Sequence, residues 1–202
     1  MATTAQMVKE LRAKTDAPMM DCKKALDESN GDMAGAVDWL RKRGVAKAEK
    51  KSGRDVMEGR IQSYIHSNGK VGVLLEMRCE TDFCARNEDF ITVTRDICMH
   101  IAASDPAPIA LTIDELPGEL LAKEKAIYEG QAKESGKPEK FWPNIVEGRM
   151  TKFKKSVALL EQPFVKNPDQ TIGQLITDMV GRIGENVTIA RYTKFRVGES
   201  AE

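Results

Sequence analysis

Up to about residue 44, apolar residues recur at the three- and four-residue spacing of one face of an α-helix. Two short polar turns interrupt this pattern, one around Pro18 and one at Asn30-Gly31. Proline is tolerated in the first turn of a helix, and Asn-Gly suits the left-handed conformation that ends one. Gly44 is expected to close the third run. The pattern therefore predicts three short helices packed as one compact module over residues 1–44.

Two adjacent methionines open the second of these predicted helices. Successive side chains on a helix point in different directions, so Met19 and Met20 cannot both face inward. We expect one of them to be exposed, beside the end of the first helix that carries Leu11; the alternative is that both only fill gaps. A flexible methionine suits a contact surface, and the module resembles the ubiquitin-associated domain architecture, which usually works as a binding module. The predicted inner face of the second helix consists of Met19, Cys22, Ala25 and Leu26.

The next stretch, residues 45–55, is basic and contains Ser52-Gly53. We interpret it as a linker with partial helical character. Its positive charge could contact phosphate, but charge runs of this kind are usually solvated. A linker between two domains is therefore the favoured interpretation.

After the linker, the pattern changes to that of strands and longer helices. Two strands are predicted over residues 57–66 and 71–79, with an Asn-Gly hairpin signal between them. A last strand over residues 186–197 could join this hairpin. The four longer helices are predicted over residues 88–103, 120–133, 139–157 and 172–182. We therefore expect residues 56–202 to form an α+β core, in which a helical layer packs on a small antiparallel sheet.

The junction between the second strand and the following helix carries Thr81, Asp82, Phe83 and Cys84. A strand end that leads into a helix start is a common place for a functional loop. A phenylalanine in such a polar turn has two interpretations. It is either a plug that folds back onto the core or a side chain presented to a partner. The local chemistry does not decide between them.

The overall charge argues against two classes of function. The chain has 202 residues, with 31 Lys and Arg against 31 Asp and Glu. A net charge of zero does not favour a protein whose main task is to coat nucleic acid or an anionic membrane. The sequence has no run of about 18 apolar residues, and its start does not resemble a secretion signal. We therefore expect neither a membrane partner nor direct contact with nucleic acid.

The four cysteines and two histidines offer little catalytic chemistry. The cysteines lack paired spacing, and we interpret them as reduced thiols of a cytoplasmic protein. A zinc site built from Cys79, Cys84, Cys98 and His100 is conceivable but matches no common spacing. The phosphate-binding motifs GxxxxGK[ST] and GxGxxG do not occur. Neither histidine has an evident acid and nucleophile that would complete a catalytic triad. We expect no cofactor and no conventional active site, which leaves action on another protein.

Several short motifs spread over nearly the whole chain become specific when they are taken together. In chain order they are residues 4–15, Met19 to Leu26, Asn30-Gly31-Asp32, Thr81 to Asn87, Glu147-Gly148-Arg149, Gln162 to Val165, and Ile183 to Asn186. Each is weak alone, but their identity and order resemble the bacterial elongation factor Ts family. The chain is similar to the short form of that family, which has one core unit where the long form has two.

This resemblance implies a guanine nucleotide exchange factor for the translational GTPase elongation factor Tu. In the family, the three-helix domain docks on the GTPase domain. The resemblance assigns this docking role to Leu11, Met19 and Met20. Short members of the family are also implied to pair as two-fold dimers, so a homodimer is expected.

The resemblance also assigns roles to two segments of the predicted core. Thr81-Asp82-Phe83-Cys84 matches the segment implicated in displacing the partner's Mg²⁺, with the aromatic ring wedged near the nucleotide site. Ile183-Gly184 matches the segment that presses close to the partner's phosphate-binding region.

The sequence departs from the family pattern at a few positions. Asp16 and Pro18 stand where members commonly have glycine, and Cys84 replaces the usual valine in a small apolar slot. Two other functions stay open. An interaction adaptor without exchange activity would bind its partner regardless of GDP and Mg²⁺, and a nucleic-acid binder using Arg41 to Arg54 would show steep salt dependence.

Overall fold

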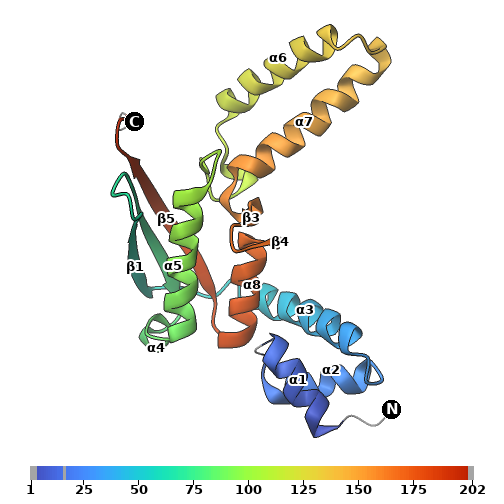
Figure 1. Cartoon of the computed structure of the whole chain (residues 1–202), viewed down its shortest axis with the longest axis vertical. Helices are drawn as coiled ribbons and strands as arrows, with labels where there is room; N and C mark the ends of the chain where they lie inside the picture. Colours follow the sequence, from blue (N-terminus) through green and yellow to red (C-terminus); the bar gives the residue numbers. More distant parts are fainter. Residues whose placement is uncertain (1–3, 16, 200–202) are drawn as a thin grey trace. The chain divides into compact units, whose positions relative to one another are not determined.

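The computed structural model describes residues 4–15 and 17–199 (Figure 1). Asp16, one of the departures from the family pattern, lies outside the described residues. The contacts within the chain divide it into two units, which interleave along the sequence. The first unit comprises Met1–Gln62, Leu75–Thr94 and Leu175–Ala190, and the second comprises Ser63–Leu74, Arg95–Gln174 and Arg191–Glu202.

The first unit begins with the three predicted helices, α1 (Ala5–Thr15), α2 (Met19–Glu28) and α3 (Met33–Glu49). Asp32 caps α3, because its carboxylate accepts hydrogen bonds from the amides of Ala34 and Gly35 at 3.4 and 2.8 Å. The helices share one small hydrophobic core. Its buried members are Val8, Leu11, Cys22, Ala25, Leu26 and Ala36.

The third helix is longer than the sequence pattern predicted. It does not close at Gly44 but continues to Glu49, so the first part of the expected linker is helical. The added residues contain no proline and include two alanines, which favour helix continuation. A Cβ atom at Gly44 would meet no atom within 4 Å, so this glycine lies in the helix without any packing requirement for it, whereas a Cβ atom at Gly181 would lie 3.4 Å from the Cα of Gly44. The division into domains at residues 44 and 55 stays a prediction.

The sheet has three strands in the order β1 (Glu58–Ile65), β2 (Val71–Cys79) and β5 (Val187–Arg196). The hairpin and the last strand were therefore predicted within two residues of their observed ends. Along β2 the burial alternates as expected for a sheet with one covered face. The buried residues of this strand are Val73, Leu75, Met77 and Cys79.

Short and long helices follow the hairpin. The turn after β2 forms α4 (Asp82–Ala85), and α5 (Glu88–Ala103) starts three residues later with the predicted bounds. Near the end of the chain, α8 (Ile172–Ile183) precedes β5. Both long helices supply fully buried side chains to the core. These include Phe90, Ile97 and Ile101 from α5, and Ile172 and Met179 from α8.

The second unit contains an antiparallel pair of helices, α6 (Gly118–Glu134) and α7 (Trp142–Val157), which form the long arm in Figure 1. Pro143 lies in the first turn of α7, where its missing amide is tolerated. A second, two-stranded sheet pairs β3 (Pro163–Phe164) with β4 (Asn167–Thr171), and β4 was not predicted. Among residues 4–15 and 17–199, short 3₁₀ turns lie at Ile113–Glu115, Glu139–Phe141 and Leu159–Glu161.

The chain is therefore α+β, as predicted from the sequence, with three helices at its start and a small antiparallel sheet later in the chain. The likeness of the first three helices to a ubiquitin-associated domain stays a prediction. None of the helices formed by residues 4–15 and 17–199 combines the length and the apolar composition that crossing a bilayer requires.

Candidate functional site

The segment expected as a loop after β2 is a single helical turn, α4. Thr81 is its N-cap, because its Oγ1 accepts a hydrogen bond from the amide of Cys84 at 3.3 Å. Asp82 occupies the first turn, where a carboxylate is favoured by the partial positive charge of the helix N-terminus. Cys84 and Ala85 are buried and attach the turn to the core.

Phe83 points away from the core that its neighbours contact. Its side chain is 80% exposed, whereas Cys84 beside it is 3% exposed. Of the two interpretations left open by the sequence, the core plug is therefore wrong. Asp82 flanks the ring with an exposed ion pair to Arg86, 2.9 Å long. The turn thus presents one large apolar side chain on a capped and anchored backbone.

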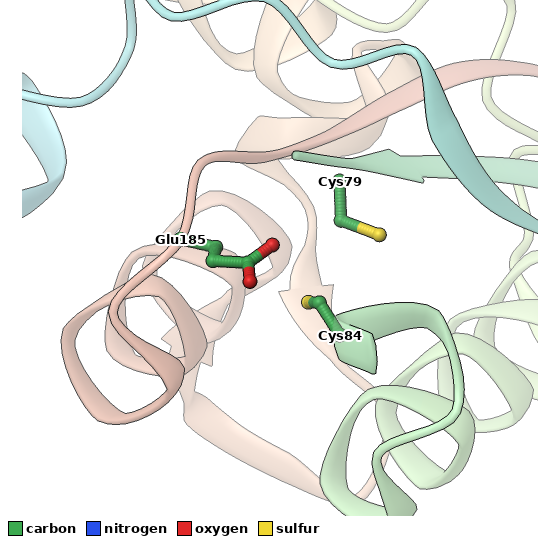
Figure 2. A group of neighbouring side chains, drawn as sticks. All are labelled: Cys79, Cys84 and Glu185. Carbon is green, nitrogen blue, oxygen red and sulfur yellow. The ribbon is translucent and has the colours of Figure 1, made fainter. Parts of the chain in front are cut away.

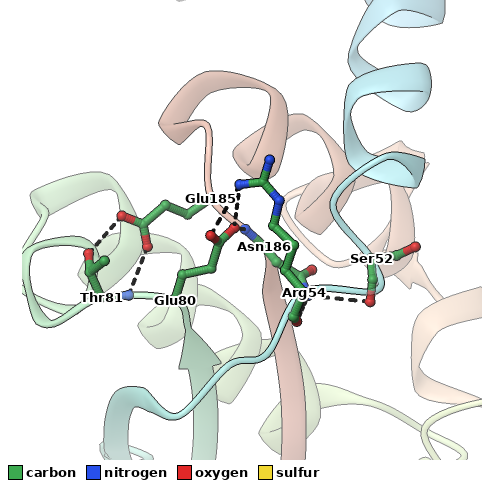
Figure 3. Close-up of polar contacts among 6 residues, drawn as sticks. All are labelled: Ser52, Arg54, Glu80, Thr81, Glu185 and Asn186. Atoms are coloured by element: carbon green, nitrogen blue, oxygen red, sulfur yellow. Dashed lines mark hydrogen bonds and ion pairs between the residues drawn. The ribbon is translucent and has the colours of Figure 1, made fainter.

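Glu185, which lies in the segment after α8, binds the start of α4 through hydrogen bonds (Figure 3). Its two carboxylate oxygens accept hydrogen bonds from the Thr81 amide at 3.0 Å and from the Thr81 hydroxyl at 2.7 Å. Hydrogen bonds to an ionised acceptor are stronger than neutral ones. The residue that caps α4 is therefore itself fixed by a side chain 104 positions further along the chain.

A second set of polar contacts adjoins the first (Figure 3). The Glu80 carboxylate accepts a hydrogen bond from the amide of Asn186 at 2.6 Å and pairs with Arg54 at 3.2 Å. The Asn186 amide and, secondarily, the Arg54 side chain lower the pKa of Glu80. The side chain of Asn186 is buried and donates to the carbonyls of Ser52 and Arg54 at 3.4 and 2.9 Å. Three segments distant in sequence are thereby joined around α4.

Beneath this polar layer, two thiols and a carboxylate lie together (Figure 2). One donor atom each from Cys79, Cys84 and Glu185 lies within 4.8 Å of the others. The Cys79 thiol donates to the carbonyl of Thr81 at 3.1 Å. Burial raises the pKa of both thiols, and for Cys84 the neighbouring Cys79 raises it further.

This group differs from the zinc site considered from the sequence. Within the described part of the chain, the potential metal ligands that cluster are Cys79, Cys84 and Glu185. Neither Cys98 nor His100 belongs to this cluster. His100 is engaged elsewhere, because its Nε2 lies 2.9 Å from Oε1 of Gln162 in the second unit. The four-ligand set that the sequence left conceivable is therefore not brought together as one cluster.

The three residues expected to dock on a partner differ in accessibility. Met19 and Met20 are 51% and 74% exposed, so Met19 does not belong to the inner face of α2 as predicted. Pro18, whose backbone is extended, starts α2 so that its first residues lie outside the small core. Leu11 is completely buried among the three helices. Direct contact between Leu11 and a partner is therefore excluded in this conformation.

Ile183 and Gly184 lie at the end of α8, immediately before Glu185. Gly184 has a φ of +85°, a left-handed conformation that glycine adopts without strain and that commonly ends a helix. Its amide donates to the carbonyl of Val180 at 2.9 Å. The sharp turn at Gly184 directs Glu185 and Asn186 toward α4, so the two segments assigned from the resemblance lie together in the first unit.

Sequence reasoning did not select Arg54, Glu80, Glu185 or Asn186 as site residues. All four are polar residues beside a segment boundary, which is the one local signal that could have drawn attention to them. Their pairing needs contacts across more than 100 positions for Glu80–Asn186 and Thr81–Glu185, and spacing alone cannot reveal such contacts.

Comparison with known proteins agrees with this arrangement of motifs. A model of the family described as Elongation factor TS matches residues 42–199. The chain belongs to the elongation factor Ts family. Elongation factor Ts of Acetivibrio thermocellus is 53% identical over 199 residues, which cover 98% of this chain and 92% of that protein. The corresponding proteins of Geobacter sulfurreducens and Solidesulfovibrio magneticus are 50% and 52% identical, and the matches cover 93% and 99% of their lengths.

Membership of the elongation factor Ts family confirms the resemblance found from the short motifs. Two of those motifs, Thr81 to Asn87 and Ile183 to Asn186, are joined by the hydrogen bonds between Thr81 and Glu185, and Glu80, just before the first motif, accepts a further bond from Asn186. In this member of the elongation factor Ts family, the turn that carries the exposed ring of Phe83 is therefore held by contacts with the segment that follows α8.

Proposed function

We propose that the chain is a guanine nucleotide exchange factor of translation elongation. It binds elongation factor Tu in its GDP form, displaces Mg²⁺ and promotes GDP release, so that GTP can bind. It acts by binding, with no active site or cofactor of its own, and works in the cytoplasm, where its partner functions. The observation that carries this proposal is the exposure of Phe83 on a turn that is capped by Thr81 and fastened by Glu185.

The physical basis of exchange is a coupling between two binding equilibria. A factor that binds the nucleotide-free partner more tightly than the loaded one must weaken nucleotide binding by the same free energy. A preformed apolar side chain is suited to this task because it gains burial only where the partner's nucleotide site has opened. Asp82, next to the ring, adds a negative charge that competes for the surroundings of the Mg²⁺ ion.

Magnitudes indicate that Phe83 does not act alone. An acceleration of GDP release by ~10³–10⁴ corresponds to about 4–5.5 kcal/mol. Complete burial of one phenylalanine supplies roughly 1.5–3 kcal/mol. Other contacts must therefore contribute, and we assign them to the three-helix module and to Ile183-Gly184.

Within the module, the docking role falls to Met19 and Met20. Both are more than half exposed at the start of α2, and a flexible thioether adapts to an apolar partner surface. Leu11, which the resemblance also assigned to docking, supports them from inside the core. We propose that Leu11 acts on binding by holding the module together.

We also propose that the chain forms a homodimer. Within the second unit, strand residues and the residues after β5 leave large apolar side chains exposed, which a second copy of the sheet would cover. These side chains are Ile65, Leu74, Phe195 and Val197. No direct binding of nucleic acid or membrane is part of this proposal.

The deciding experiment measures dissociation of a fluorescent GDP analogue from elongation factor Tu at fixed Mg²⁺ concentrations. The expected result is an acceleration that rises with the concentration of this protein and diminishes as Mg²⁺ is increased. Binding without acceleration, indifferent to GDP and Mg²⁺, would support the adaptor function in its place. Binding to nucleic acid that weakens steeply with salt would support the third alternative.

A further inference from the structure

Cys79, Cys84 and Glu185 form a cluster that the exchange function does not use. They come from three separate places: the end of β2, the one-turn helix α4, and the residue after the left-handed Gly184. One donor atom from each lies within 4.8 Å of the other two (Figure 2). The fold, and not local sequence, brings these three side chains together.

The donor set has a definite chemical preference. Two thiolates and a carboxylate suit a cation that accepts sulfur, and Zn²⁺ binds both ligand types with tetrahedral geometry. At Zn–S distances of about 2.3 Å and Zn–O distances of about 2.0–2.2 Å, neighbouring ligand atoms lie roughly 3.4–3.8 Å apart. Donor atoms that lie up to 4.8 Å apart therefore need to approach by about 1.0–1.4 Å at most, which side-chain rotation can supply.

The other contacts of these side chains are compatible with a bound cation. The Glu185 oxygens accept hydrogen bonds from Thr81, but a carboxylate has about four lone-pair positions, so capacity for a metal remains. The Cys79 thiol gives up one weak hydrogen bond to the Thr81 carbonyl when it loses its proton. Both cysteines are buried, whereas Glu185 is half-buried and leaves one side of the cluster open to a water ligand.

We propose that Cys79, Cys84 and Glu185 form a binding site for a thiophilic divalent cation, with Zn²⁺ as the biological ion and water as the fourth ligand. Binding releases the two thiol protons to solvent and involves no oxidation. The ion joins α4 to the segment that contains Gly184. Its ligand on α4, Cys84, is the residue directly after Phe83. Its occupancy therefore restricts the turn that presents the aromatic ring. This site does not depend on the exchange function, because metal binding is measured on the free protein.

Titration of the reduced full-length chain with Co²⁺ tests the proposal, since Co²⁺ reports thiolate ligation by its absorption. The expected result is one Co²⁺ per chain, with thiolate-to-cobalt charge-transfer bands and the visible bands of a tetrahedral site. Zn²⁺ added afterwards should abolish these bands by displacement. Absence of thiolate bands in the native chain would overturn the proposal.

Two matched variants locate the site. Cys84→Val retains a small apolar side chain in the buried slot and leaves Cys79 as the one thiolate ligand, so we expect it to reduce the thiolate bands at a given Co²⁺ concentration and to weaken metal binding by more than the ~10–100-fold that loss of an outer supporting group causes. Cys98→Ala removes another buried cysteine, in the second unit, and should leave the bands unchanged. Bands of undiminished intensity and unchanged affinity in Cys84→Val would contradict the assignment.

A measurement on the native chain covers the case in which Cys84→Val does not fold. Alkylation under native conditions, followed by mass mapping, compares the four cysteines with and without Zn²⁺. We expect Zn²⁺ to slow the modification of Cys79 and Cys84 selectively, with Cys22 and Cys98 unaffected. Equal rates with and without the metal at Cys79 and Cys84 would refute the site.

Discussion

At the scale of single residues, Phe83 is an exposed side chain whose position is determined by its buried neighbours. Cys84 and Ala85 fix the backbone of α4 in the core, and Thr81 and Glu185 fix its start. The ring itself makes little contribution to folding, because 80% of its surface is exposed. Substitutions of Phe83 and of its supports should therefore have different consequences.

We predict that Phe83→Ala slows stimulated GDP release more than it weakens docking on elongation factor Tu, with a change in unfolding free energy within about 0.5 kcal/mol. The ring is expected to stabilise the state in which the nucleotide is displaced, while Met19 and Met20 keep the two proteins bound to each other. Stopped-flow release rates and equilibrium binding separate the two effects. Phe141→Ala, at a second exposed phenylalanine just before α7, is the matched control. Equal losses of rate and affinity would contradict this division.

A second prediction distinguishes Leu11 from Met20. Leu11→Ala removes a fully buried side chain and should destabilise the three-helix module by about 2–5 kcal/mol. Met20→Ala changes an exposed position and should leave stability within about 0.5 kcal/mol, yet weaken binding to the partner. Thermal unfolding together with binding measurements tests this contrast, and a stable Leu11→Ala protein with weak binding would restore a direct contact role for Leu11.

At the scale of elements, the pairing of α4 with the turn after α8 depends on a few charge-assisted hydrogen bonds. We predict that Glu185→Gln, which retains the size of the side chain, loosens α4 and costs up to about 1.5–3 kcal/mol, less where solvent screens the contact. Hydrogen exchange at the amides of Thr81 and Cys84 should accelerate. Glu147→Gln, an exposed position on α7, is the control. Unchanged protection at Thr81 would show that its contact with Glu185 is not maintained in solution.

Another element-scale feature is the packing of α5 near β3 in the second unit. His100 on α5 is buried, and its Nδ1 accepts a hydrogen bond from the amide of Val165 at 3.3 Å. Its Nε2 therefore carries the proton and donates to Oε1 of Gln162 at 2.9 Å. Burial lowers the pKa of His100, and the charge of Lys194 lowers it further.

The lowered pKa of His100 gives a pH dependence of stability with a definite sign. Since the folded state binds its proton less readily than the unfolded state, the stabilisation is complete above the unfolded pKa of about 6.5 and is lost as pH falls toward the folded value. Urea unfolding between pH 8 and pH 5 should show this decline. His100→Gln is expected to flatten it, whereas His66→Gln, at an exposed histidine of the hairpin turn, should not. A decline unchanged in His100→Gln would assign the dependence to other groups.

At the scale of the whole molecule, regular elements were predictable and their long-range pairing was not. The bounds of β2 and α5 followed from period-2 and period-3.6 patterns, which local sequence carries directly. The extension of α3 past Gly44 was missed because glycine was interpreted as a stop, although a single glycine is tolerated inside a helix at a modest cost. The contacts of Glu80 with Asn186 and of Thr81 with Glu185 could not be predicted, since nothing in either segment specifies the other.

The family resemblance named candidate segments but not their geometry. It indicated Phe83 and Met20, whose exposure the structure now gives, and it also indicated Leu11, which is buried. A helical pattern specifies which residues share a face, but not how much of a small module's surface remains after packing. The exposure of a side chain depends on how the whole chain folds, so it could be learned only from the folded structure.

A prediction for the whole molecule concerns its assembly. Phe195→Asp places a charge on the exposed apolar surface of the second unit and should convert the proposed dimer into a monomer. Sedimentation velocity at several concentrations measures this change. Glu199→Lys, nearby after β5, is the charge-changing control that should leave the dimer intact. Identical sedimentation of Phe195→Asp and the native chain would exclude this surface from the interface.

The fastening of α4 by Glu185 limits what can be copied from this protein into a smaller molecule. A synthetic peptide spanning residues 79–87 would contain the aromatic residue and the Thr81 cap, but helices of one turn do not persist in water. The ring would then point in many directions, and the conformational entropy lost on ordering the peptide would oppose insertion of the ring into the partner. A peptide inhibitor of the partner GTPase would therefore require a covalent staple in the place that Glu185 occupies in the folded chain.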